Sequence, residues 1–441
     1  MGQSLHGNVA REFIRQHEEL GGRFIVEGNQ WFSWEKDHYR RVPEEEVRRT
    51  FWYFISNKGT AGTRHEASEV MEAYAAISLA ERETVDTARP GWVVTPAGEN
   101  HDDVLLSFRN GLVGLSGLLR GEALVRPHTR DYFTQTVLPY NYDPDAQCPR
   151  WHQCINEWVP DPAAVAFLQE YVGYLLTPDY SHQIGLFLEG SGANGKSVFC
   201  EVVTRMLGRA NVSGVPLDRF GDAYSLETTL GKLANIATET SKWAKVPEGI
   251  LKQFISGEPM FFNQKYVRPF TTKPTARLII SWNERPRLND GSDALWRRIR
   301  LVKFPRRYKP SEQDPALVDK LATELPGVFN WALAGLHSLR QRGRPLDVAS
   351  ITESVESLRA DNDSVRSFVG EALVPREGAS VLKSAVYDAY KTFCDDHADR
   401  ALGPTAFFRR VYEILSLDPD RSIQRVGPNR ARCLVGVSLA V

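Results

Sequence analysis

The sequence predicts an α/β domain with a mainly parallel sheet, preceded by a mostly helical module and followed by a small winged-helix domain. Two buried runs, "IGLFLEG" and "ARLIISWN", alternate with helical patterns up to about residue 310, an order typical of a parallel sheet. Near the end of the chain, the helices "SVLKSAVYDAYKTFCDDH" and "PTAFFRRVYEIL" precede a hairpin that turns at Pro428-Asn429. We therefore expect four segments, at 1–155, 156–310, 311–360 and 361–441.

Composition indicates an ordinary globular protein with more than one core. Of 441 residues, 42% are hydrophobic and 25% are charged, and 54 basic residues face 55 acidic ones. No apolar window is long enough for a signal peptide or a membrane span, so we expect a cytoplasmic protein with no membrane partner. Any basic surface must be local.

The five cysteines are predicted to be reduced thiols, because an odd number without a signal peptide does not suggest a disulfide framework. Cys148, His152 and Cys154 have a spacing that zinc could use. A fourth ligand is not apparent nearby, so buried thiols are favoured over a metal site.

The first segment combines helical and strand patterns. In "PEEEVRRTFWYFI", an acidic first turn after Pro43 predicts a helix. Asn110-Gly111 lies between the apolar runs of "DDVLLSFRNGLVGL" and predicts a hairpin. The proline-rich stretch "VLPYNYDPDAQCPRW" predicts a connector, and hence a domain boundary, near 145–160.

The stretch "LFLEGSGANGKSVF" contains a complete phosphate-loop motif, G-x-x-x-x-G-K-[ST]. Its residues are Gly190, Ser191, Gly192, Ala193, Asn194, Gly195, Lys196 and Ser197. Glycines let the backbone N–H groups surround phosphate oxygens at a helix N-terminus. Lys196 supplies a charge for the β- and γ-phosphates, and the Ser197 hydroxyl is suited to Mg²⁺. A strand before the loop and a helix after it favour nucleoside triphosphate binding over a simple glycine-rich turn.

Three downstream segments offer residues that complete a possible hydrolytic site. Glu239 ends the apolar run of "KLANIATETS", where a carboxylate can reach Mg²⁺ and polarise a water, although a solvated strand end remains an alternative. Asn283 ends the strand "LIISWN" and could hydrogen-bond the attacking water or the γ-phosphate. In "LWRRIRLVKF", Arg297 and Arg298 offer guanidinium groups for the active site of a neighbouring subunit, or form a basic surface.

Basic residues are concentrated between 265 and 309, where 13 basic residues face three acidic ones, a net charge of +10. Such a segment favours a polyanionic partner. Within it, "GEPMFFNQKYVRPF" predicts a hairpin with Lys265 and Tyr266 near the tip. A cation beside an aromatic ring suits single-stranded nucleic acid, although an exposed turn with a buried tyrosine is the alternative.

Taken in this order, these motifs resemble superfamily 3 DNA helicases, and most closely the phage/plasmid primase-helicase group related to the poxvirus primase-helicase. The resemblance covers about residues 100–340 and implies an AAA+-like phosphate-loop ATPase core. It implies that ATP and Mg²⁺ are bound by Lys196 and Ser197, with Glu239 as the Walker B acid and Asn283 as the sensor. Arg298, favoured over Arg297, would be a finger acting in trans. Lys265 and Tyr266 would track DNA inside a hexameric ring.

The function implied by the resemblance is ATP-driven 3′ to 5′ unwinding of single-stranded or forked DNA by a ring. It would replicate a phage, plasmid or integrated element in a bacterial or phage-infected cell, with a separate primase or polymerase as a further partner. One departure is that Thr240 and Ser241 follow Glu239, where a second acid is frequent. The alternatives are an origin-binding initiator that does not unwind strongly, a bifunctional primase-helicase, and a small-molecule kinase, which leaves the basic hairpin unexplained.

Overall fold

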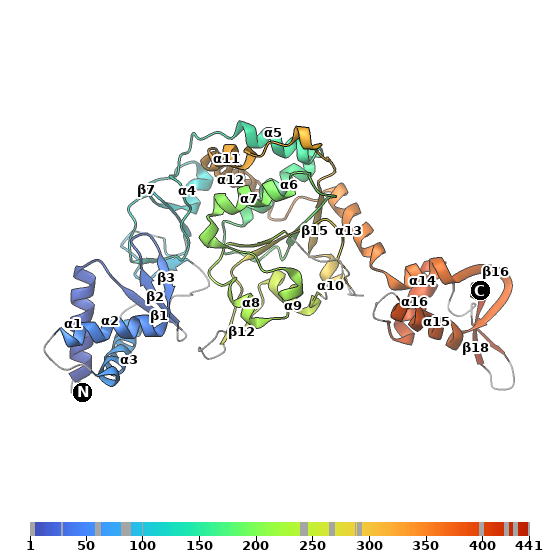
Figure 1. Cartoon of the computed structure of the whole chain (residues 1–441), viewed down its shortest axis with the longest axis horizontal. Helices are drawn as coiled ribbons and strands as arrows, with labels where there is room; N and C mark the ends of the chain where they lie inside the picture. The colour runs from blue at the N-terminus through green and yellow to red at the C-terminus, as the bar shows by residue number, and fades with distance from the viewer. Residues whose placement is uncertain are drawn as a thin grey trace.

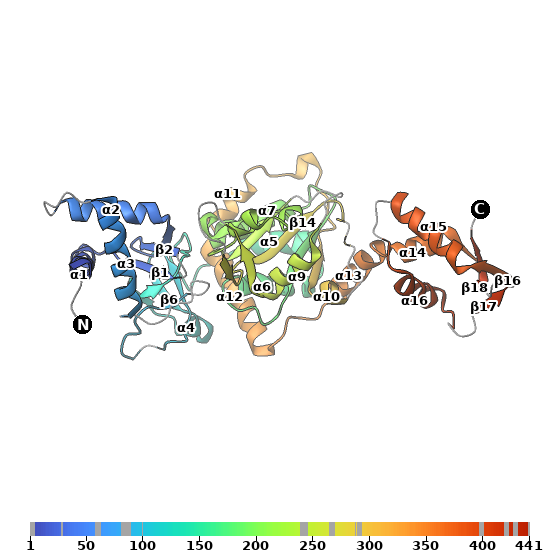
Figure 2. The ribbon, with the colours of Figure 1, turned by 90° about the horizontal axis from the view of Figure 1, so that it is seen from below.

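The computed structural model describes residues 5–27, 30–57, 63–80, 90–98, 100–238, 246–263, 270–286, 288, 293–396, 401–418, 423–426 and 431–439. Three parts lie in a row: an N-terminal part, a central part built on a sheet, and a C-terminal part (Figures 1 and 2). Among the described residues, no helix is long and apolar enough to cross a bilayer.

The central sheet has five strands, all parallel, in the order β10-β11-β14-β9-β15. Its strands are β9 (Gly185–Glu189), β10 (Val212–Ser213), β11 (Ala234–Ala237), β14 (Arg277–Trp282) and β15 (Ile299–Lys303). Because the strands are parallel, their carboxyl ends meet at one edge, where ligands bind in open α/β sheets. The mainly parallel sheet predicted from the sequence is confirmed.

Helices cover both faces of this sheet because its strands are apolar on both sides. Leu186 and Leu188 of β9 belong to the core under the helices of one face, whereas Phe187 belongs to the core of the other face. The first face carries α5 (Pro149–Trp158), α6 (Pro162–Tyr174), α7 (Lys196–Leu207), α11 (Leu317–Ala322) and α12 (Leu325–Arg342). The opposite face carries α8 (Ala223–Glu227), α9 (Glu248–Ser256) and α10 (Asp293–Trp296), as Figure 1 shows.

Helices α6 and α12 touch backbone to backbone. A methyl group on Gly173 would lie 2.2 Å from the carbonyl oxygen of Ala332, and one on Gly335 would lie 2.3 Å from the carbonyl oxygen of Gln169. Real Cβ atoms do not approach so closely, so glycine at both positions permits this packing. The two helices therefore form one unit over the sheet.

The N-terminal part contains more strand than the mostly helical module that we expected. Its helices are α1 (Leu5–Glu19), α2 (Glu44–Ser56), α3 (Arg64–Ala80) and α4 (Leu115–Arg120). Its strands are β1 (Phe24–Glu27), β2 (Gln30–Trp34), β3 (Tyr39–Val42), β4 (Gly91–Trp92), β5 (Leu105–Phe108), β6 (Gly111–Gly114), β7 (Val125–Arg126) and β8 (Tyr132–Phe133). These strands have two to five residues each, too short for a clear alternating pattern in the sequence.

Two local predictions in this part are confirmed. The acidic first turn begins helix α2, and β5 pairs with β6 in a hairpin in which Phe108 lies opposite Gly111. The turn itself is formed by Arg109 and Asn110, one residue before the predicted Asn-Gly pair. Gly111 has φ of +143°, and a Cβ there would lie 2.1 Å from the Arg126 carbonyl oxygen. A side chain here would meet the neighbouring strand β7, so the start of β6 requires glycine at this position.

The C-terminal part follows the order helix, strand, helix, helix, strand, strand. Its elements after the connecting helix α13 (Ala349–Asp361) are α14 (Ser364–Ala372), β16 (Leu373–Leu382), α15 (Lys383–Asp396), α16 (Pro404–Leu415), β17 (Ile423–Val426) and β18 (Ala431–Leu439). The three strands form an antiparallel sheet in the order β16-β18-β17. The predicted turn at Pro428-Asn429 lies outside the described residues, and the winged helix stays a prediction.

Candidate active site

The loop between β9 and α7 carries the predicted phosphate-loop motif, with a strand before it and a helix after it. Gly192, Ala193 and Gly195 have φ of +93°, +49° and +92°, so the backbone turns sharply before the first residue of α7. A Cβ on Gly195 would lie 2.5 Å from the indole ring of Trp158, at the end of α5. Glycine therefore lets the loop sit directly on the helical layer, with the N-terminus of α7 open to an anion.

The ammonium group of Lys196 is held by three neutral oxygen atoms. Its Nζ donates hydrogen bonds to the Gly190 carbonyl oxygen at 2.6 Å, to Asn194 Oδ1 at 3.1 Å and to Asn283 Oδ1 at 3.1 Å. Burial lowers the pKa of Lys196, while the nearby charges of Cys200 and Glu189 act in the opposite direction. A cation whose partners among the described residues are neutral is well suited to exchange them for phosphate oxygens.

The structure brings the predicted residues Lys196 and Asn283 together. Asn283 follows β14, and β14 lies next to β9, whose loop leads to Lys196. Thr238 follows β11, on the other side of β14. Glu239 and the hairpin residues Lys265 and Tyr266 lie outside the described residues.

Beside Ser197, a hollow of about 620 Å³ opens between α7 and the ends of β10 and β11. Its lining includes Thr238 and the polar side chains of Glu201 and Thr204 on α7. The hollow therefore adjoins the hydroxyl that we predict to hold Mg²⁺.

Arg298 lies away from the phosphate loop within the same chain. It precedes β15, whose first residue pairs with Gly185, so Arg298 is at the edge of the sheet opposite the loop. Its side chain is buried and donates from Nε to Ser256 Oγ at 2.8 Å, from Nη1 to the Ala294 carbonyl oxygen at 2.6 Å and from Nη2 to Gln183 Oε1 at 3.2 Å. Burial, followed by the charge of Arg297, lowers the pKa of Arg298. Arg297 itself is exposed.

The hairpin predicted from "GEPMFFNQKYVRPF" is described only at its base, where β12 (Met260–Phe262) pairs with β13 (Phe270–Thr272). The rings of Phe262 and Phe270 are stacked. Arg41, from β3 of the N-terminal part, lies over the Phe270 ring at 5.9 Å and pairs with Glu227 at 2.6 Å. The N-terminal part therefore contacts the base of the hairpin.

Not all of the basic side chains that the structure describes in this segment are free at the surface. Arg277 and Arg298 are buried, and Arg285 is paired with Glu189 and Asp361. The net charge counted along the sequence therefore overstates the charge that is free at the surface. Within the described part of this segment, exposed cations remain at Lys273, Arg297, Lys303, Arg307 and Lys309, and at Arg306, which pairs with Glu157.

Sequence reasoning missed the ion pair between Glu189 and Arg285. Glu189 is the last residue of β9 and directly precedes the phosphate loop, and Arg285 follows the sensor position by two residues. Their contact depends on the pairing of β9 with β14, which aligns Glu189 with Trp282. The one sign of this pair in the sequence is that the apolar run of β9 ends on a charged residue, Glu189.

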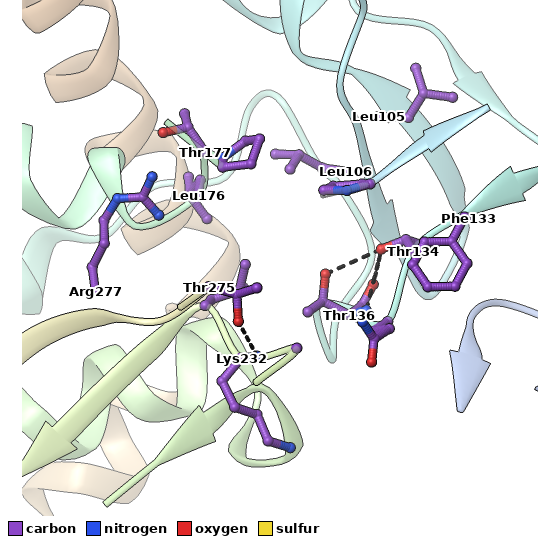
Figure 3. A pocket seen from close by; sticks show the side chains of 15 residues that line it. Leu105, Leu106, Phe133, Thr134, Thr136, Leu176, Thr177, Lys232, Thr275 and Arg277 are labelled. Atoms are coloured by element: carbon purple, nitrogen blue, oxygen red, sulfur yellow. Dashed lines mark hydrogen bonds between the residues drawn. The ribbon is translucent and has the colours of Figure 1, made fainter. Parts of the chain in front are cut away.

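A second cavity lies where the N-terminal part meets the amino edge of the sheet (Figure 3). It measures about 50 Å³ and is bordered by Thr134 and Thr136 on one side and by Thr177, Thr275 and Arg277 on the other. The guanidinium group of Arg277 lies 4.3 Å from the Tyr174 ring and 4.8 Å from the Tyr180 ring, and it donates to the Asp179 carbonyl oxygen. These contacts join the segment before β9 to β14, so the cluster holds the fold together.

The possible zinc ligands do not assemble into a metal site. Burial raises the pKa of the Cys148 thiol to about 12 and that of Cys154 to about 11. Within the described residues, no group of three or more His, Cys, Asp or Glu side chains is arranged to hold a metal ion.

Comparison with known families gives two matches. Residues 11–160 match the family described as "D5 N terminal like", and residues 188–298 match a family of unknown function, DUF5906. The second match begins in β9 and ends at Arg298, so it contains the phosphate loop, Asn283 and the base of the hairpin.

Curated relatives are viral proteins. "Putative helicase L207/L206" of Acanthamoeba polyphaga mimivirus is 22% identical over 318 residues, which cover 64% of this chain and 32% of that protein. "Putative helicase 121R" of Invertebrate iridescent virus 3 is 22% identical over 231 residues, 49% of this chain and 24% of its own length. The chain thus spans about a third or less of these relatives.

Among solved structures, the apo C-terminal region of NrS-1 has a similar fold. One form has a TM-score of 0.51 at 10% identity, over 96% of this chain and 98% of that one. Another has a TM-score of 0.50 at 9% identity with the same coverage. The resemblance to the phage/plasmid primase-helicase group that the motifs carry is therefore confirmed, because the chain contains a D5 N-terminal-like region and is related to viral proteins named as helicases.

Proposed function

We propose that this chain is an ATP-driven, ring-forming DNA helicase that unwinds DNA during replication of a phage, plasmid or integrated element. One observation carries the proposal: the ammonium group of Lys196 lies 3.1 Å from Asn283 Oδ1 at the carboxyl edge of the parallel sheet. The strand order β10-β11-β14-β9-β15, with the loop after β9 and the asparagine after the adjacent strand, supports an AAA+-like ATPase core. The viral relatives support DNA unwinding as the work that hydrolysis performs.

The residues present fit a triphosphate with Mg²⁺. Lys196 would exchange its neutral oxygen partners for β- and γ-phosphate oxygens, while backbone N–H groups at the start of α7 bind the remaining charge. Ser197 and Glu239 would hold Mg²⁺, which neutralises charge on the phosphates. Asn283 would orient the attacking water, with Glu239 polarising it.

DNA would be held by Lys265 and Tyr266 beyond the strands β12 and β13. The lysine would bind backbone phosphate and the tyrosine would stack on a base or sugar, with movement from 3′ to 5′ along one strand. A hexameric ring, in the cytoplasm of a bacterial or phage-infected cell, would place six such hairpins around single-stranded or forked DNA. A separate primase or polymerase would be a further partner.

The ring would also supply an arginine to each active site from the neighbouring subunit. Arg298 is the finger implied by the resemblance, and to act on a neighbouring subunit it would have to exchange its bonds to Ser256, Ala294 and Gln183. Arg297 is exposed beside it and needs no such exchange. We propose that one of these two arginines acts in trans.

A second candidate function is an origin-binding initiator that unwinds DNA weakly. The order of elements in the C-terminal part favours it, because α14, β16, α15, α16, β17 and β18 follow the order of a winged helix, a fold that binds duplex DNA. In this function, ATP would drive assembly at one sequence. A bifunctional primase-helicase would need primer synthesis, which a ribonucleotide incorporation assay on a DNA template would detect.

The proposal is tested by ATP hydrolysis and strand displacement on a forked DNA. We expect the full chain to hydrolyse ATP faster with DNA and to separate the fork, and Lys196→Ala to lose both activities while still binding DNA. Tight binding to one duplex sequence without strand displacement would favour the initiator. ATP hydrolysis that DNA does not change would contradict both functions.

A further inference from the structure

A charged group that the proposed mechanism does not use lies directly against the phosphate loop. Arg285 binds both carboxylate oxygens of Glu189, with Nε to Oε1 at 2.5 Å and Nη2 to Oε2 at 2.9 Å. Both side chains are mostly buried, with exposed fractions of 22% and 16%. Two parallel bonds from a guanidinium group fix the positions of both partners, which a single ammonium contact cannot do.

Glu189 is a problem for a site that binds a triphosphate. It directly precedes Gly190, and its charge is one of the two that raise the pKa of Lys196, so its carboxylate is within electrostatic reach of that ammonium group. Without a counterion, this carboxylate would repel the phosphates that Lys196 attracts. The guanidinium group of Arg285 covers the carboxylate and removes the repulsion.

Arg285 also fixes the sensor. Trp282 of β14 pairs with Glu189, and Asn283 is the next residue along the chain. Two residues later, Arg285 returns to the same Glu189 and closes a short loop around the asparagine. The Oδ1 atom of Asn283, inside this loop, lies 3.1 Å from Lys196 Nζ.

A third contact ties Arg285 to α13. Its Nη1 donates to Ser357 Oγ at 3.0 Å and also to a carboxylate oxygen of Asp361. Asp361 is the last residue of α13, which continues into the C-terminal part. The guanidinium group therefore has partners in both β9 and α13.

We propose that Arg285 is a positioning residue for ATP hydrolysis: it neutralises Glu189 so that a triphosphate can approach Lys196, and it holds Asn283 in place for the reaction. This inference rests on the proposed function, since it assigns Arg285 a part in that same site. Neutralisation acts on nucleotide binding, whereas placement of Asn283 acts on turnover. The two effects can be separated by mutation.

The experiment measures steady-state ATP hydrolysis by the full chain carrying Arg285→Ala, Glu189→Gln, both together, or Arg285→Lys. We expect Arg285→Ala to raise KM about tenfold and to lower kcat about tenfold. In the double variant, Glu189→Gln should return KM to within about threefold of the wild type, because the uncharged glutamine no longer repels the phosphates. Its kcat should stay low, because Asn283 is still not held in place. Arg285→Lys should keep KM and lose kcat, since the charge remains without the two-point grip.

Arg344→Ala is the matched control, because Arg344 forms an exposed ion pair with Asp347 in the turn after α12. Kinetics of Arg285→Ala equal to those of the control would overturn the inference. The inference would also be overturned if the double variant melted at the wild-type temperature but Glu189→Gln did not restore its KM. If Arg285→Ala does not fold, the Arg285→Lys variant still decides, since unchanged kcat in that variant contradicts a positioning role.

Failure of the proposed function would be seen in the wild type itself, and not in the variants. If the wild type binds a fluorescent ATP analogue but does not hydrolyse ATP, the helicase proposal fails. The dissociation constants of the ATP analogue for the wild type, Arg285→Ala, Glu189→Gln and the double variant then test charge neutralisation alone. Restoration of binding by Glu189→Gln would support it, and its absence would refute it.

Discussion

Replacing Arg298 with alanine is expected to destabilise the protein, because the side chain is buried and bound within its own chain. Two of its acceptors, Ser256 Oγ and the Ala294 carbonyl oxygen, lie in partly or fully buried surroundings at 2.8 and 2.6 Å. Losing a charged donor costs about 1–2 kcal/mol for each such acceptor, whereas exposed Gln183 can bind water instead. We therefore expect a loss of about 3 kcal/mol, which corresponds to a fall of roughly 8 °C in Tm for a core of this size.

Arg297→Ala is the matched variant, since the neighbouring side chain is exposed and its removal should change stability by less than about 0.5 kcal/mol. Thermal unfolding of both full-length variants, followed by differential scanning calorimetry, measures the difference. Equal melting temperatures would refute the reasoning and would leave Arg298 available to a neighbouring subunit.

The same two variants identify the finger. Each is mixed with Lys196→Ala subunits, which lack the phosphate-loop lysine but retain both arginines. In a mixed ring, the variant that lacks the finger regains hydrolysis because its neighbour supplies the guanidinium group. The arginine whose variant gains no activity on mixing is not the finger.

Three other outcomes are expected. Lys265→Ala should keep basal ATP hydrolysis and lose its stimulation by single-stranded DNA, and unchanged unwinding would contradict the role of the hairpin. Gly195→Ala should weaken the binding of a fluorescent ATP analogue by at least about tenfold, because φ of this residue is +92° and the added methyl group would meet Trp158. Wild-type affinity in this variant would contradict the loop geometry. Burial raises the pKa of Cys154 to about 11, so little of the thiolate that reacts with iodoacetamide is present at pH 8. The alkylation rate of Cys154 should therefore rise with pH up to that pKa, and a rate that levels off near pH 9 would contradict this. Added zinc should not protect Cys154 from alkylation.

The parts of the site that the sequence predicts are those encoded in one continuous stretch. Residues 190–197 carry their own turn glycines and lysine, so no knowledge of the rest of the chain is needed to place them at the start of a helix. Asn283 could be expected beside Lys196 once its strand was assumed to neighbour β9, and the contact at 3.1 Å agrees with that expectation.

Other features depend on contacts between distant segments. Glu189 and Arg285 meet only because β14 lies next to β9, and nothing near Arg285 in the sequence identifies its partner. The burial of Arg298 is hidden for a similar reason, since Ser256 and Gln183 come from other elements. Charge counted along a chain cannot distinguish such arginines from those at the surface. The short strands of the N-terminal part were missed because two to five residues give too little periodicity.

The close packing of α6 on α12 also limits how this protein can vary. At Gly173 and Gly335 the contact is made by backbone atoms, so no side chain is present that could be shortened or rotated to accept a methyl group. A larger residue at either position would force the two helices apart and disturb the layer on which the phosphate loop rests. Evolution can therefore repack the surrounding leucines and phenylalanines by compensating changes, whereas these two glycines offer no compensating partner.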